Sequence, residues 1–253
     1  MSVLTIAQRV ARAAGFTAPS SLVGSTDETA IQLLELIKEE TTNLSDGVIA
    51  GRDNSIDYNW QVLVKRGTFN FASGAEAYDV PVDFKDYIPN TMWNYTAKRP
   101  IIVPINAEEF EVQKNYLTTT GIDKMIYFYA DQMHVVPNPS ATATDTINYE
   151  YTTTYIYQSS GGTGQTDILA DTDVTTISEN IVLLGVKFRF LQAKGIIPTS
   201  SYMNSLEYQN YVSAVQRAMY KDGMGQKRPI SFNRRGRAFW LAAYTQDSDY
   251  PAS

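Results

Sequence analysis

The sequence predicts an α+β protein, in which helices from both ends of the chain form a bundle and an antiparallel β-rich region is inserted between them. Apolar residues recur at three- and four-residue spacing near both ends and alternate in the middle, and the end of the chain shows neither period. We assign residues 1–60 and 178–220 to the bundle and residues 61–177 to the inserted β-rich region. Residues 221–253 form an extended C-terminal arm, which we call the arm.

Two helices are expected before residue 60. In residues 1–16 the apolar positions fit one helical face, and although an amphipathic, acid-free start resembles a transit peptide, we interpret it as a structural helix. Ser25-Thr26-Asp27-Glu28 has the pattern of a capping box for the second helix, with the Ser25 hydroxyl and the Glu28 carboxylate as its side-chain groups. The predicted inner face of that helix contains Ile31, Leu34, Ile37, Thr41 and Leu44.

The β-rich region begins where the apolar period changes to two. Strand patterns cover residues 61–71, 77–80, 87–93, 101–105 and 146–157, and a hairpin is expected over 124–136 around Asp131. A short helix is predicted for 106–117 and a glycine-rich linker for 159–167. The strand at 146–157 would place four tyrosines on one face, namely Tyr149, Tyr151, Tyr155 and Tyr157.

Two helices are expected to complete the bundle. Residues 178–194 are apolar almost all round, so this helix is either central in its own fold or sandwiched against a neighbouring subunit. Its Gly185 costs helix propensity, which indicates a close backbone approach, and Gly195 is the expected stop signal. The last helix is predicted over about 201–220.

Composition excludes several classes of function. The chain has 253 residues, of which 43% are hydrophobic and 19% charged, as in a folded globular protein. It contains no cysteine and one histidine, which excludes disulfides, thiolate metal sites and multi-histidine metal sites. No apolar run approaches the roughly 18–20 residues of a membrane span, so no membrane partner is expected.

No catalytic constellation is evident, so we expect no enzyme activity and no cofactor. The single His134 lies in a predicted strand, where we interpret it as a polar residue on a sheet face. The stretch GGTGQT lacks the Lys-Ser/Thr of a phosphate loop. Paired acids could serve a glycosidase, but solvated helix faces and turns explain the pairs Glu39-Glu40, Glu108-Glu109 and Asp171/Asp173.

The arm differs from the rest of the chain in charge. It carries six basic and three acidic residues, whereas the preceding 220 residues carry 15 basic and 24 acidic ones. Arginine binds phosphates, which makes nucleic acid one candidate ligand, and it also binds carboxylates on a protein. The neighbouring large apolar side chains favour a protein partner, because Trp and Arg are enriched at interface hot spots. The predicted docking residues are Lys227, Arg228, Phe232, Arg234, Arg235, Arg237, Phe239 and Trp240.

Two blocks of sequence carry a resemblance to a known family. Residues 57–94 contain a Trp leading into a strand, then Tyr78-Asp79-Val80-Pro81 and Trp93. Residues 178–196 form an apolar helix with Arg189 that ends at Lys194-Gly195. Together they resemble the head-to-tail adaptor, or connector, proteins of tailed bacteriophages, and are similar to the tail tubular protein A type of short-tailed phages. The resemblance covers roughly residues 1–220.

That resemblance implies a structural virion protein in the neck of the phage, assembled in the bacterial host cytoplasm. It implies a homo-oligomeric ring, with twelve copies expected, that sits below the portal protein and joins it to a tail protein of nozzle or tail-tube type. Genomic DNA would pass through the ring, and the acidic core would not adhere to it. In this interpretation the arm docks on the portal; the alternative is a DNA-binding protein that acts through the arm.

Overall fold

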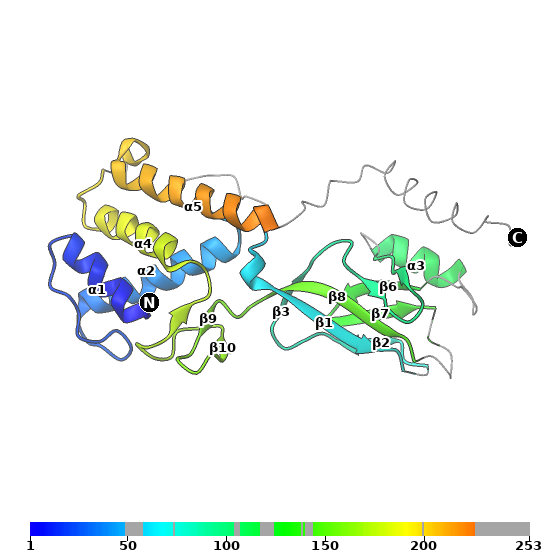
Figure 1. Cartoon of the computed structure of the whole chain (residues 1–253). Helices are drawn as coiled ribbons and strands as arrows, with labels where there is room; N and C mark the ends of the chain where they lie inside the picture. Colours follow the sequence, from blue (N-terminus) through cyan, green and yellow to red (C-terminus); the bar gives the residue numbers. More distant parts are fainter. Residues whose placement is uncertain are drawn as a thin grey trace, which may run out of the picture.

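The chain folds into two halves, one helical and one built of sheets, in a computed structural model (Figure 1). The structure describes residues 1–48, 58–72, 74–103, 107–116, 124–137, 139, 144–198 and 200–225. The predicted class, a helical bundle with an inserted antiparallel β-rich region, is confirmed. The two halves have separate hydrophobic cores that share no residue.

The helical half contains helices from both ends of the described chain. They are α1 (Val3–Ala13), α2 (Glu28–Ser45), α4 (Glu179–Ala193) and α5 (Leu206–Gly225), with the 3-10 turn η2 (Tyr202–Asn204) before α5. Helix α4 packs against α1, α2 and α5. Most of its apolar side chains are therefore buried within its own chain, with Leu183 and Leu184 partly buried, which agrees with the first of the two interpretations of this helix. Gly195, with φ +72°, ends the segment as predicted.

The caps of the bundle helices differ from the prediction in one place. Ser2 caps α1 and accepts a hydrogen bond from the Thr5 N–H at 3.3 Å. The N-cap of α2 is Asp27, whose carboxylate accepts from the Thr29 N–H at 3.3 Å, so the predicted Ser25 capping box is wrong. The Ser25 hydroxyl accepts instead from the Asp27 N–H. The predicted inner face is also shifted, because Ile31 faces solvent while Ala30 and Leu33 are buried.

Helix α5 begins later and ends later than predicted. The Ser205 hydroxyl accepts from the Tyr208 N–H, which starts the helix at Leu206. The helix then continues to Gly225, because neither Gly223 nor the charged pair before it interrupts the backbone hydrogen bonds. The first residues assigned to the arm are therefore helical.

The sheet half is formed by β1 to β8. The strands are β1 (Val64–Asn70), β2 (Ala77–Asp79), β3 (Phe84–Tyr87), β4 (Trp93–Asn94), β5 (Arg99–Pro100), β6 (Met125–Tyr129), β7 (Gln132–Val136) and β8 (Thr146–Thr153). One sheet has the order β1-β8-β4-β5 with β3 also paired to β8, and the other has the order β2-β7-β6. The sheet core is made of Phe71, Met92, Ile101, Ile126, Met133, Val135, Ile147, Tyr149 and Tyr151.

Several of the predicted β-region elements are confirmed. The β6–β7 hairpin turns at Ala130 and Asp131, which both have positive φ, as a two-residue hairpin turn requires. The short helix α3 (Ala107–Tyr116) lies where it was expected. The strand predicted at 87–93 is instead split between β3 and β4, because Asn90 adopts φ +64° and turns the chain.

The strand predicted at 146–157 is shorter in the structure, and its tyrosines are divided between the two halves. Strand β8 ends at Thr153, and Tyr157 begins β9 (Tyr157–Gln158), which pairs with β10 (Gly164–Gln165) and β11 (Val174–Thr175). The predicted glycine linker is therefore part of a small third sheet. Ile156, Tyr157, Ile168 and Ile177 belong to the core of the helical half, so the tyrosines do not share one face.

Candidate assembly site

The predicted docking residues of the arm all lie outside the described residues. These are Lys227, Arg228, Phe232, Arg234, Arg235, Arg237, Phe239 and Trp240. The structure does place the residues that lead into them, because α5 runs toward the joint between the two halves (Figure 1). We use the term joint for Ser45, Asp46, Tyr58, Trp60, Lys85 and Asp222. In it Lys85 of the sheet half contacts Ser45 and Asp46, and Tyr58, Trp60 and Asp222 lie where the chain passes from the helical core toward β1.

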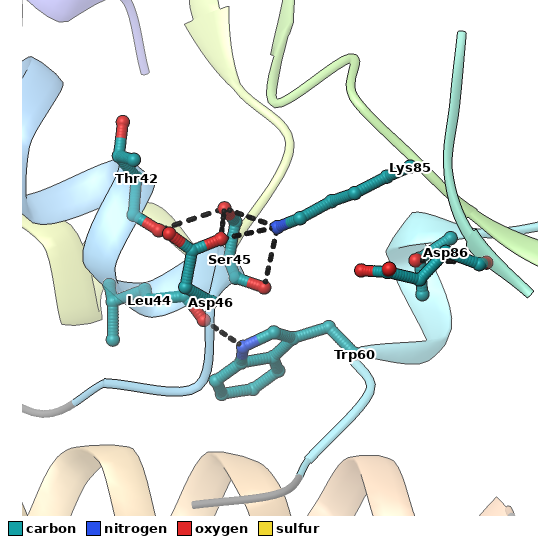
Figure 2. Close-up of polar contacts among 8 residues, drawn as sticks. Thr42, Leu44, Ser45, Asp46, Trp60, Lys85 and Asp86 are labelled. Carbon is teal, nitrogen blue, oxygen red and sulfur yellow. Dashed lines mark hydrogen bonds and ion pairs between the residues drawn. The ribbon is translucent and has the colours of Figure 1, made fainter. Parts of the chain in front are cut away.

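The C-terminal end of α2 is the centre of the joint (Figure 2). Lys85 of β3 donates from Nζ to the Ser45 carbonyl and hydroxyl, both at 3.2 Å, and to the Asp46 carboxylate at 2.5 Å. The last carbonyls of a helix lack intrahelical donors and carry partial negative charge, so a cation at this position is stabilising. A residue from the sheet half thus completes a helix of the other half.

Trp60 makes the second contact of the joint. Its buried indole Nε1–H donates to the Leu44 carbonyl at 2.8 Å (Figure 2). Trp60 directly precedes the 3-10 turn η1 (Gln61–Leu63) that leads into β1. The chain is therefore pinned to the end of α2 just before it enters the sheets.

The start of the arm is tied to the same place. The Tyr58 hydroxyl donates to the Asp222 carboxylate at 2.7 Å and lies 3.0 Å from the Met219 carbonyl. The Gln61 N–H donates to the same carboxylate at 2.9 Å. Burial, followed by the adjacent Asp222 carboxylate, raises the pKa of Tyr58, so the hydroxyl remains a donor at neutral pH. The first residues of the arm, at the end of α5, are consequently held at the joint.

A charged network lies where β1 and β8 leave the sheet for the joint. The Asp83 carboxylate accepts from Lys65 Nζ at 2.6 Å, from the Thr153 hydroxyl at 2.8 Å and from the Tyr151 hydroxyl at 3.0 Å. Burial alone would raise the pKa of Asp83, but these hydrogen bonds outweigh it and hold the pKa below its usual value. The network ties the segment before β3 to the ends of β1 and β8 that lie nearest the joint.

A second charged cluster is buried between α2 and α4, where the prediction for Glu40 is wrong. Glu40 was expected on a solvated helix face, yet it is fully buried and accepts from Arg189 Nε at 2.6 Å. Arg189 also pairs with Glu39. A Cβ on Gly185 would lie 2.2 Å from Glu40 Oε1. The close approach predicted at Gly185 is thus made by a carboxylate and not by backbone.

The remaining acidic candidates have structural roles. Asp171 accepts from the backbone N–H groups of Leu22 and Val23, and Asp173 accepts from those of Leu169 and Ala170. Glu108 and Glu109 occupy the exposed first turn of α3. His134 pairs with Ala77 across β7 and β2, on a sheet as expected.

Within the described part of the chain no acid, histidine or cysteine cluster has the composition of a metal site. No described helix is long and apolar enough to cross a membrane.

The joint could be predicted only in part. The sequence indicated that Trp60 stands where helical spacing gives way to strand spacing, and this residue proved to be a joint residue. Lys85 and Asp222 carried no comparable signal, because each contacts a segment distant in the sequence.

Comparison with known proteins identifies the class. Residues 1–246 match the family described as SU10 adaptor protein, and the chain therefore belongs to that family. No curated protein matches. The expectation of a bacteriophage structural adaptor, a component of the virion, is confirmed at this level. The match also extends past Lys221 into the arm, where the sequence had shown no recognisable pattern.

Proposed function

We propose that this adaptor forms a ring below the portal, joins the portal to the tail and lets genomic DNA pass through its centre. Twelve copies are the expected number, and the tail-side partner is a nozzle or tail-tube protein, as in the tail tubular protein A type. The arm docks on the portal through its arginines and aromatic residues. Membership of an adaptor family supports interaction with other virion proteins.

The observation that carries the portal-docking proposal is the contrast between the arm and the rest of the chain. Six of the 21 basic residues fall after Tyr220, together with one of the three tryptophans, Trp240, and the neighbouring Phe239. Arg234, Arg235 and Arg237 can bind carboxylates bidentately. A segment of this composition suits docking on an acidic protein surface with apolar pockets.

The anchored start of the arm supports the same role. Tyr58 and Gln61 both bind Asp222 near the end of α5. Because the start of the arm is held at the joint, binding of the arm to the portal would also position the joint relative to the portal. The sheet half and the helical half would then be held in one orientation relative to the portal.

Passage of DNA is supported by charge alone. The 220 residues before the arm carry nine more acidic than basic groups, and phosphate adheres to clustered Lys and Arg. A lumen lined by this part of the chain would repel the duplex and let it slide.

Removal of residues 226–253 tests the proposal, because α5 and the joint remain intact in the truncated chain. Attachment to portal-bearing heads is expected to be lost in co-sedimentation, while circular dichroism and the melting temperature stay those of the full chain. Electron microscopy of the full chain with its portal is expected to show rings. Unchanged co-sedimentation of the truncated chain would contradict portal docking by the arm.

The DNA-binding alternative makes a different prediction for the same pair of proteins. It requires the full chain to bind duplex DNA with an affinity that falls steeply with salt, with a slope set by about five or six phosphate contacts. The truncated chain would lose that binding. Absence of duplex binding at low salt removes the alternative and leaves portal docking as the role of the arm.

A further inference from the structure

Strand β1 is a long open edge of the sheet half (Figure 1). It pairs with β8 over seven residues without a register shift, and no described strand pairs with its other side. The other edges of the two main sheets are short or covered. Strands β2, β3 and β5 have three, four and two residues, and β6 is covered where the Ile126 N–H donates to the Ile102 carbonyl. Since exposed edges bind other strands, natural proteins usually protect them, and β1 lacks such protection.

The open side of β1 presents unpaired backbone groups. The Phe71 N–H donates to the Asp145 carbonyl at 2.9 Å, and residues of an antiparallel ladder alternate between facing the partner strand and facing away. Every second residue of β1 therefore turns its backbone N–H and C=O away from β8. These residues are Arg66, Thr68 and Asn70. Within the described chain their backbone groups make no hydrogen bond, so the ligand that this edge fits is an extended backbone.

An aromatic ring with an unpaired hydroxyl lies beside the same edge, on the inner face of the sheet. Tyr149 of β8 is 2% exposed and stands opposite Gly67 of β1. A Cβ on Gly67 would lie 2.3 Å from the ring and 2.7 Å from the hydroxyl, so the ring crosses β1 where glycine leaves room for it. The hydroxyl has no hydrogen-bond partner among the described residues. An added strand would cover the ring together with Phe69, whose ring centroid lies 6.1 Å away.

The arm begins near the end of β1 that lies closest to the joint. Asp222 accepts from the Gln61 N–H at 2.9 Å, and Gln61 precedes Val64, the first residue of β1, by three positions. The described part of α5 ends at Gly225, and five further residues can span about 17 Å when extended. The next part of the arm can therefore reach the open side of β1, and from this end it would run parallel to β1.

The sequence that follows α5 has the pattern of an edge strand. Residues 229–233 are Pro-Ile-Ser-Phe-Asn, in which Ile230 and Phe232 alternate with Ser231 and Asn233. A strand of this pattern turns its apolar residues to one face and its polar residues to the other. Proline is tolerated as the first residue of a strand, because its missing N–H is then not needed in the ladder.

Both faces of this segment match those of the sheet beside β1. On the inner face Phe232 would lie opposite Gly67 and contact the Tyr149 ring. On the outer face Ser231 and Asn233 would continue two polar rows of β1 and β8. In these rows Thr68 donates to Asn148 at 2.8 Å, and Thr146 donates to Asn70 at 2.9 Å.

Charge is compatible with this placement. Residues 229–233 are uncharged, and in this register Ser231 lies beside Arg66. The flanking Arg228 and Arg234 each stand three positions from Ser231, about 10 Å along a strand, which is about a Debye length at 0.1 M salt. Lys65 is already paired with Asp83 at 2.6 Å.

We propose that residues 229–233 of the arm add to the open edge of β1 in the same chain as a parallel strand. The inference goes beyond the proposed docking and does not depend on the portal. It assigns Phe232 to the sheet half and leaves Arg234 to Trp240 for the portal. The docking part of the arm would then start beside the sheet half and not at the end of α5.

Residue-resolved hydrogen exchange tests the pairing by comparing the full chain with the chain that lacks residues 226–253. The N–H groups of Arg66 and Thr68 should exchange at least about fivefold more slowly in the full chain, because the added strand protects them. Those of Gly67 and Phe69 bind β8 and should be protected equally in both chains. The melting temperature should stay the same, because the hydrogen bonds of one short edge strand are offset by the cost of ordering it.

A disulfide tests the register, since the chain has no cysteine of its own. The full chain with Arg66→Cys and Ser231→Cys should form a disulfide within one chain on mild oxidation. The control joins Ser231→Cys to Tyr129→Cys, where Tyr129 is 65% exposed in β6 of the same half. The yield should be at least about tenfold higher for the Arg66 pair, because the added strand raises the local concentration of the two thiols.

Two variants of Thr68 separate backbone pairing from a side-chain effect. Thr68→Pro removes an N–H that faces away from β8, so it should abolish the disulfide and leave the β1–β8 ladder in place. Thr68→Ala removes the same side chain, keeps the N–H and should keep the disulfide. Protection of the Gly67 N–H in both variants reports that β1 is still paired with β8.

Equal exchange of the Arg66 and Thr68 N–H groups in the full and truncated chains would overturn the proposal. A disulfide that forms only between chains would overturn it as well, because the strand would then come from another copy. Co-sedimentation with portal-bearing heads is measured separately on the unmodified chain. Its failure contradicts the proposed function and leaves the exchange and disulfide results to decide the strand.

Discussion

The two halves of the molecule are stabilised in different ways. The helical half brings together both ends of the described chain around an apolar helix, and it buries an ion pair, Glu40–Arg189, against Gly185. The sheet half is formed by the stretch from β1 to β8, and aromatic rings stack inside it, including Phe84 and Tyr87, which both stack with Phe128. Since the cores share no residue, damage to one half should leave the other half largely intact. The joint then decides how the halves are oriented.

The largest expected effect is in the helical half. Arg189→Ala removes the partner of a fully buried carboxylate, and breaking a buried pair in this way costs about 3–5 kcal/mol of unfolding free energy. Chemical denaturation measures it. The control Lys38→Ala removes a more exposed pair with Asp167 and is expected to cost less than about 1 kcal/mol.

The same variant has a defined pH dependence. Burial raises the pKa of Glu40, and Arg189 acts against that rise. Without Arg189 the folded state holds a proton on Glu40 that the unfolded state releases, so the stability of Arg189→Ala should fall as pH rises from 5 to 8. A flat profile over this range would show that Glu40 finds another cation or water.

Two glycine substitutions compare the packing of the halves directly. A Cβ on Gly185 would lie 2.2 Å from Glu40 Oε1, and one on Gly67 would lie 2.3 Å from the ring of Tyr149. Both neighbours are buried, so Gly185→Ala and Gly67→Ala should each cost about 2 kcal/mol despite the gain in helix propensity at the first. Hydrogen exchange is expected to show loosening only in the half that carries the change. Loosening of both halves by either variant would contradict the independence of the cores.

Asp83→Asn is expected to cost less, about 1–2 kcal/mol at neutral pH, because Asn still accepts from one hydroxyl but loses the charge that Lys65 pairs with. The lowered pKa of Asp83 stabilises the fold above the unfolded value of about 3.9, and this contribution disappears as pH falls through the folded pKa. The difference between the wild type and the variant should therefore shrink below about pH 4. Urea midpoints measured at pH 7 and pH 3 check it.

The sequence predicted what local patterns determine. The spacing of Val3, Ile6 and Val10 located α1, and Asp131 marked the β6–β7 hairpin, because these features depend on neighbours in the chain. The face of α2 was misjudged because Ile31 is apolar but exposed and Glu40 is charged but buried. Only the position of Arg189, on a helix far along the chain, reveals why Glu40 is tolerated inside. For the same reason the Lys85 contact with Asp46 had no signal in the sequence.

The smallest effect on stability is expected at the joint, where a substitution should change the orientation of the two halves more than the stability of either one. Lys85→Met removes the cation from the end of α2 but keeps an aliphatic side chain of similar length, so the unfolding free energy should fall by less than about 1 kcal/mol. The orientation of the halves should nevertheless change, because Lys85 is a contact from the sheet half to α2, whereas Trp60 and Tyr58 pack with the core of the helical half. Spin labels on one exposed site in each half measure this as a broader distance distribution, with Lys114→Met, which removes an exposed pair with Glu76 inside the sheet half, as the control. An unchanged distribution in Lys85→Met would mean that Trp60 and Tyr58 suffice to fix the halves, and the joint would then reduce to those two contacts.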